Sequence, residues 1–131
     1  ATPFEHRSFG EELALCQRYF NIFGKEETGN NYENFGQVVA FSTGAGDHRM
    51  TMTMPTTMRA IPTVASSGNI ATLGQVDGGG GTLSSIGLAD GGSKTIIGLN
   101  LTMAGGNVVG DVSPVRSNND ADAFISFDAE L

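Results

Sequence analysis

Glycine divides most of this chain into short segments. The 131 residues include 19 glycines, which gather in clusters such as 78–81 and 91–92 and follow no fixed period. Between the clusters, apolar and polar residues alternate over short runs, and such alternation places side chains on the two faces of a strand. Glycine clusters are typical of the turns that join strands. The pattern therefore predicts an all-β chain.

The alternation is clearest in two segments. In 49–54 the residues Met50, Met52 and Met54 share one face and threonines occupy the other. In the last segment, 124–131, the expected inward residues are Ile125, Phe127, Ala129 and Leu131. Further strands are expected at 36–43, 68–76, 82–88, 94–103 and 108–112, turns at 89–93 and 104–107, and polar loops at 25–35 and 113–123. About eight strands at roughly ten-residue intervals predict a jelly-roll-like antiparallel β-sandwich.

One stretch, Phe9 to Gly24, predicts a short helix instead. Leu13, Cys16 and Phe20 fall three and four residues apart, which places them on one helical face. A helix this short is not stable alone. We therefore expect it to close an open end of the sandwich as a lid, with Cys16 buried, or to contact a neighbouring subunit. Residues 1–9 are interpreted as a connector from an upstream module, and residues 10–131 as the sandwich domain.

Charge and composition exclude several classes of function. The net charge is −7, and the seven lysines and arginines are scattered, so we expect no nucleic-acid partner. No apolar run approaches the roughly 20 residues that a bilayer requires, so we expect no membrane insertion. The single cysteine cannot form a disulfide within the chain.

No motif indicates catalysis or a cofactor. The stretch "GLADGGSKT" lacks the adjacent Gly-Lys-Thr of a phosphate-binding loop and is better explained as a hairpin turn. His48 follows Asp47, but no third partner or nucleophile motif accompanies the pair. Two histidines and one cysteine make a zinc site improbable. We therefore expect a protein that is not an enzyme and that has neither a metal nor a cofactor.

Asn118, Asp120 and Asp122 stand at alternate positions, as in the opening of an EF-hand calcium loop. The sixth and twelfth positions are Ala123 and Ala129 where that loop requires glycine and glutamate. This excludes an EF-hand and leaves open an irregular surface site for calcium.

Three segments carry a family resemblance: "ATPFEHRSFGEELALCQRYF" at the start, "MPTTMRAIPTV" at 54–64 and "FISFDAEL" at the end. Together they resemble the C-terminal β-sandwich domain of phage tail-fibre and virion-appendage proteins, although Phe20 stands where that family usually has a second tyrosine. The resemblance implies a jelly-roll-like head on the virion, commonly a homotrimer, which contacts other virion proteins and a host surface receptor, often a glycan.

Loops are expected to carry such recognition, because they vary while the sheets hold them. Tyr32 lies among asparagines in "GNNYEN", and an aromatic ring beside amides suits a hydroxyl-rich ligand. The candidate ligand-binding residues are Asn30, Asn31, Tyr32, Asn118, Asn119 and Asp120. Two alternatives stay open: a capsid decoration (cement) or assembly adaptor protein with no ligand of its own, and a bacterial carbohydrate-binding module.

Overall fold

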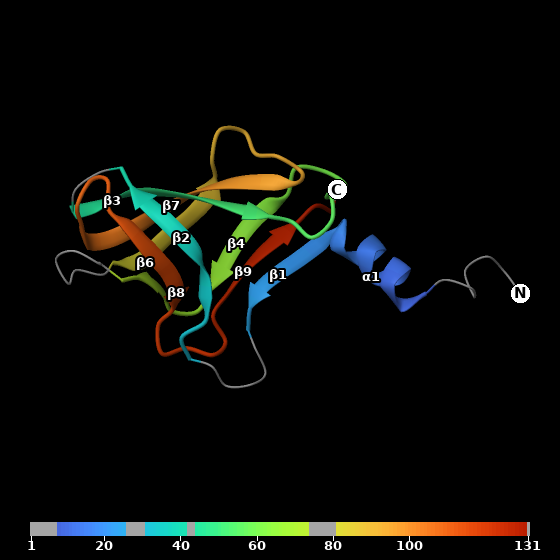
Figure 1. Cartoon of the computed structure of the whole chain (residues 1–131), viewed down its shortest axis with the longest axis horizontal. Coiled ribbons are helices and arrows are strands. Elements are labelled where there is room, and N and C mark those ends of the chain that lie inside the picture. Colours follow the sequence, from blue (N-terminus) through green and yellow to red (C-terminus); the bar gives the residue numbers. More distant parts are fainter. Residues whose placement is uncertain (1–7, 26–30, 42–43, 74–80, 131) are drawn as a thin grey trace, which may run out of the picture.

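The computed structural model describes residues 8–25, 31–41, 44–73 and 81–130. Within these residues the chain forms one helix and nine strands, and every strand pairing is antiparallel, which confirms the all-β prediction (Figure 1). The elements are α1 (Phe9–Gln17), β1 (Phe20–Gly24), β2 (Asn34–Ala40), β3 (Gly44–Thr53), β4 (Thr63–Ser67), β5 (Ile70–Thr72), β6 (Thr82–Leu88), β7 (Ile96–Asn107), β8 (Val112–Ser117) and β9 (Phe124–Asp128).

The strands form two sheets that share one core. Six of them close into a barrel in the order β2-β3-β7-β6-β5-β8, and the other three form a small sheet in the order β1-β9-β4. The long pair β3–β7 runs from Gly44↔Asn107 to Thr53↔Ile96. The arrangement agrees with a β-sandwich whose larger sheet closes on itself; the jelly-roll strand order stays a prediction.

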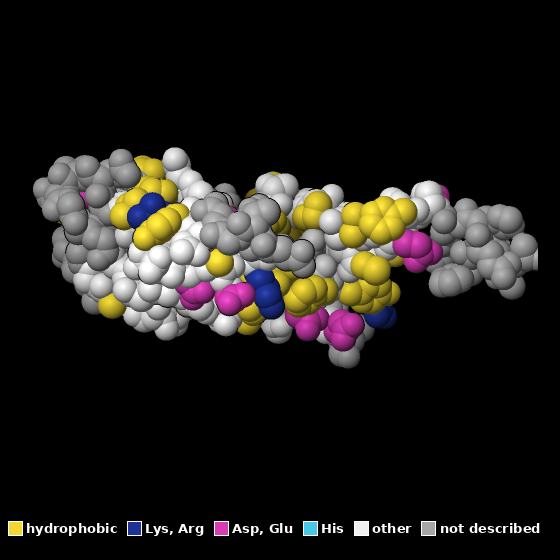
Figure 2. All heavy atoms as spheres, turned by 90° about the horizontal axis from the view of Figure 1, so that it is seen from below, with side chains coloured by type: hydrophobic (Ala, Val, Ile, Leu, Met, Phe, Trp, Pro, Cys, Tyr) yellow, Lys and Arg dark blue, Asp and Glu magenta, His cyan; other side chains and the backbone are white. Residues whose placement is uncertain are grey.

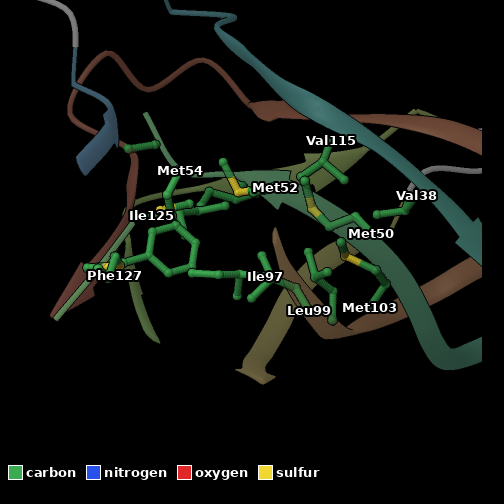
Figure 3. Close-up of a cluster of buried hydrophobic side chains, with 14 of the residues drawn as sticks. Val38, Met50, Met52, Met54, Ile97, Leu99, Met103, Val115, Ile125 and Phe127 are labelled. Atoms are coloured by element: carbon green, nitrogen blue, oxygen red, sulfur yellow. The ribbon is translucent and has the colours of Figure 1, made fainter. Parts of the chain in front are cut away.

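The core follows the predicted alternation. Met50, Met52 and Met54 all point inward and are buried, as expected from the threonines between them. Figure 3 shows the Phe127 ring and Ile125 at one end of this cluster and Val38, Val115, Met50 and Met103 at the other. Residues from both sheets thus pack into a single hydrophobic core.

The C-terminal segment also behaves as predicted. Ile125, Phe127 and Ala129 are buried, and Leu131 lies outside the described residues. β9 pairs with β1 on one side and with β4 on the other, so it is the central strand of the small sheet. Residues 124–129 are therefore built into the fold.

The predicted helix is too long. It ends at Gln17, and Phe20–Gly24 forms β1, paired with β9. The side-chain Nδ2 of Asn21 donates to the backbone carbonyl oxygen of Gln17 at 2.6 Å, which satisfies one of the carbonyl groups that lack a partner at a helix end. The aromatic and β-branched residues of β1 favour a strand once β9 offers hydrogen bonds.

The lid prediction is wrong. Leu13 and Phe20 are 45% and 48% exposed, Cys16 is exposed as well, and none of the residues of α1, all of them described, is buried. The helix projects from the β-body instead of covering it (Figure 1). The reason is that the chain enters the small sheet directly at β1, which puts Phe20 on the outer face of that sheet. A role for these three residues in a subunit contact stays a prediction.

Two predicted connections are strands. Residues 104–107 belong to β7 and not to a turn, and the actual turn lies at 108–111, where Gly110 has a φ of 90°. Residues 113–117 of the predicted polar loop belong to β8. β8 includes Pro114, which lies just beyond the last β5 pair, Thr72↔Val115, where a missing N–H is tolerated.

Candidate functional site

Two loops that are far apart in the sequence meet at one end of the molecule. The Asn31 amide nitrogen donates to Asn119 Oδ1 at 3.3 Å across a separation of 88 residues, and the Asp120 N–H donates to the Asn31 carbonyl oxygen at 3.1 Å. Five of the six candidate ligand-binding residues therefore lie on one surface; Asn30 lies outside the described residues. We name this surface the loop face and define it by Asn31, Tyr32, Arg116, Asn118, Asn119 and Asp120.

Ser117, at the end of β8, holds the two loops together. Its side chain is buried, with Oγ accepting the Glu33 N–H at 2.6 Å and donating to the Asn31 carbonyl oxygen at 3.0 Å. The Ser117 N–H donates to the Glu33 carbonyl oxygen at 2.8 Å. Since buried hydrogen bonds are costly to break, the backbone on either side of Tyr32 is fixed by the barrel.

Tyr32 is the large exposed side chain of the loop face. It is 48% exposed, and the Arg116 guanidinium carbon lies 4.7 Å from the centre of its ring. Sequence reasoning missed Arg116 and treated it only as one scattered positive charge. No sequence signal marks it, because 113–123 is predicted as a loop; in β8 it lies between Val115 and Ser117, both buried, and therefore points outward.

Asp120 organises the loop from within. Its Oδ2 accepts the Asn69 N–H at 2.7 Å, and its Oδ1 accepts the Asp122 N–H at 3.0 Å. The Asn69 amide nitrogen donates to the Asn118 carbonyl oxygen at 3.0 Å, which ties in a third loop. Asn119 adopts a left-handed φ of 53°, a conformation that asparagine tolerates better than most residues. The loop face is therefore pre-organised by its own hydrogen bonds.

The described residues do not assemble a metal centre at this end or elsewhere. No group of three or more His, Cys, Asp or Glu side chains among them is placed to hold an ion. The carboxylate of Asp120 is occupied by backbone N–H groups, as described above. The chemistry that the loop face offers is thus that of amides, one phenol and one guanidinium.

Leu13, Cys16 and Phe20 belong to a different surface. Exposed apolar side chains run from α1 onto β1 and the segment before β4, and Figure 2 shows hydrophobic side chains gathering over α1 and β1 among charged ones. We name this surface the helix face; its apolar members are Phe9, Leu13, Tyr19, Phe20, Ile22 and Ile61. None of these side chains is buried by the residues that the structure describes.

Comparison with known proteins gives no relative. No family model, no curated protein and no solved structure matches this chain. Among the helices that the structure describes, none is long and apolar enough to cross a membrane.

Proposed function

We propose that this chain is the head domain of a phage virion appendage, a tail fibre or spike, and that it binds a host surface glycan through the loop face without catalysing a reaction. One observation carries the proposal: the exposed Tyr32 ring is backed by Arg116 and bordered by the linked amides of Asn31 and Asn119. The sequence resemblance to appendage proteins supports a place on the virion.

The geometry suits a sugar for two physical reasons. A pyranose has an apolar face of C–H groups and an edge of hydroxyls, and the loop face sets an aromatic ring beside amide donors and acceptors. The loops are also held rigidly through Ser117 and Asp120, so little conformational entropy is lost on binding. The affinity of a single such contact is low, and several copies on one particle raise the overall avidity.

The helix face supports the proposal of a homotrimer. A helix of nine residues is too short to persist in water by itself, and within the described part of the chain its apolar residues Phe9 and Leu13 stay exposed. We expect sedimentation equilibrium to give three times the 13.6 kDa chain mass, and Leu13→Glu to lower this to one chain. A wild-type protein that stays monomeric at tens of micromolar would contradict the trimer.

The role of Tyr32 can be tested on a glycan array. Tyr32→Ala is expected to weaken binding to the best glycan by at least about tenfold, because an aromatic anchor at the centre of an interface supplies much of its affinity. Leu73→Ala is the control, since Leu73 is also exposed, at 38%, and belongs to neither the loop face nor the helix face. Equal losses for both variants would count against the loop face.

The second candidate function is a capsid decoration or assembly adaptor protein. The exposed helix face favours it, because such a surface suits a permanent contact with other virion proteins. The array separates the two candidates. A chain that binds no glycan and no host cell, yet attaches to virions that lack it, would establish the adaptor and overturn glycan binding.

A further inference from the structure

A groove of about 300 Å³ lies on the outer face of the barrel, away from the loop face. β2, β3 and β7 form its floor, and the turn after β6 forms one wall. In Figure 1 that turn lies at the upper edge of the molecule, while residues 31–33 before β2 and 118–123 after β8 lie at the lower edge. The residues that line the groove include Gln37, Val39, Arg49, Thr51, Ala89 and Asp90.

Glycine and alanine keep the side chains at the floor of the groove small. Thr51 on β3 pairs with Gly98 on β7, and a Cβ atom at Gly98 would lie 3.3 Å from the Cβ of Ala89, tighter than an ordinary contact. Next along the strands, Arg49 pairs with Asn100, which in turn pairs with Gly87. Gly98 and Gly87 carry no side chain on this outer face, and Ala89 packs over Gly98, so a small methyl group and no bulky side chain stands at this part of the groove.

Arg49 and Asp90 stand side by side at the rim. Arg49 Nη1 donates to Asp90 Oδ2 at 2.5 Å, and the guanidinium carbon lies 5.6 Å from the centre of the Phe41 ring. Asp90 adopts a left-handed φ of 51°, which aspartate and asparagine tolerate. Both charged side chains stay accessible, at 43% and 78% exposed. A donor and an acceptor are thus presented together at fixed positions.

The charge balance selects a neutral ligand. Asp90 already matches the charge of Arg49, and the exposed Asp47, also on the outer face of β3, adds a further negative charge. An incoming anion would have to displace Asp90 against a chain of net charge −7. Two adjacent hydroxyls meet the pair without displacing it, since one accepts from the guanidinium and the other donates to the carboxylate.

We propose that this groove is a second saccharide site, which takes one neutral hexopyranose unit. The hydroxyls lie against Arg49 and Asp90, with Gln37 and Thr51 as further polar partners, and the C–H face lies against Val39 and Ala89. The ligand class rests on the proposed function of glycan binding. With the loop face, each chain then holds two weak sites, which raises the avidity of the assembled particle.

The test is a titration followed by amide NMR, with the methyl glycosides of glucose, galactose and mannose as neutral probes and glucuronate as the anionic one. At least one neutral probe is expected to shift the amides of Thr51, Ala89 and Gly98 in the millimolar range, and glucuronate to bind more weakly. Arg49→Gln and Asp90→Asn should each lower the affinity for the neutral probe by about tenfold, because each removes a charged hydrogen-bonding partner. Arg59→Gln is the control, since it removes another exposed arginine, outside the groove, and should leave the affinity for the neutral probe unchanged.

The outcomes distinguish the two sites. Shifts confined to Tyr32, Arg116 and Asn119 would overturn the groove and support the loop face. Shifts confined to the groove would support this inference and overturn the loop face as the glycan site. Tighter binding of glucuronate than of every neutral probe would overturn the assignment to a neutral ligand, and an absence of shifts at both places would overturn both proposals.

Discussion

Phe127→Ala is expected to lower the free energy of unfolding by about 3–5 kcal/mol, the usual cost of truncating a buried phenylalanine. Phe127 is 0% exposed and lies on β9, the central strand of the small sheet. Its ring meets that of Phe23 on β1 edge to face, with 5.8 Å between the ring centres. The substitution leaves a cavity where the small sheet packs on the barrel core, and close-packed neighbours fill such a cavity only in part.

Urea denaturation followed by circular dichroism measures this loss. Phe41→Ala is the matched control, because Phe41 is 58% exposed and its ring contacts only Arg49 among the cations of the described residues. The control should cost less than about 1 kcal/mol, as surface substitutions commonly do. Similar costs for the two variants would mean that the small sheet does not share the barrel core.

Gly24→Ala is expected to lower the free energy of unfolding by about 2–5 kcal/mol, although it adds a single methyl group. Gly24 has a φ of 92°, where a side chain costs about 1–2 kcal/mol. Its new Cβ atom would also lie 2.5 Å from the Ala123 carbonyl oxygen and 2.5 Å from Phe35 Cε1. That carbonyl accepts the Lys25 N–H at 3.0 Å, so relief requires a backbone shift, an overpacking cost of about 1–3 kcal/mol.

Gly110→Ala isolates the first of these terms, the cost of a side chain at a left-handed φ. Gly110 has a φ of 90°, but a Cβ atom there would meet nothing within 4 Å. Thermal unfolding of both variants should therefore show a loss of about 1–2 kcal/mol for Gly110→Ala and a clearly larger one for Gly24→Ala. If the two losses are the same, the close approach of β1 to Ala123 and Phe35 is not as the structure has it.

The parts of the fold that were predictable from sequence are those with a local signal. The methionines of β3 and the residues Ile125 and Phe127 of β9 alternate with polar neighbours, and each strand needs only its own residues to show this period. The segment 82–88 was predicted with the bounds that β6 has, because glycine marks its start and a hairpin turn its end.

The parts that failed depend on distant partners. Phe20 continues the helical spacing of Leu13 and Cys16, and only pairing with Asp128 on β9 turns it into a strand residue. The sequence of β8 predicts a polar loop because it contains Pro114 and polar residues. It becomes a strand only by pairing with β2 and β5, which lie far away in the sequence. Barrel closure has no local signature at all.

The candidate site also has a part that the sequence predicts and a part that depends on distant contacts. Tyr32 and the asparagines were selected by residue type, whereas their meeting at one surface depends on a contact between Asn31 and Asn119. The stacking of Arg116 on Tyr32 follows from β8 and could not be inferred while that segment was taken for a loop. The sequence therefore predicts which residue types suit a ligand, but which of them lie together follows only from the strand topology.

The central claim is that the loop face holds a sugar, and a crystal structure of the chain with its best-binding array glycan tests it most directly. We expect a sugar ring over Tyr32, with hydroxyls within hydrogen-bonding distance of Arg116 and Asn119. A glycan bound on the helix face, or anywhere that leaves Tyr32 untouched, would contradict this account.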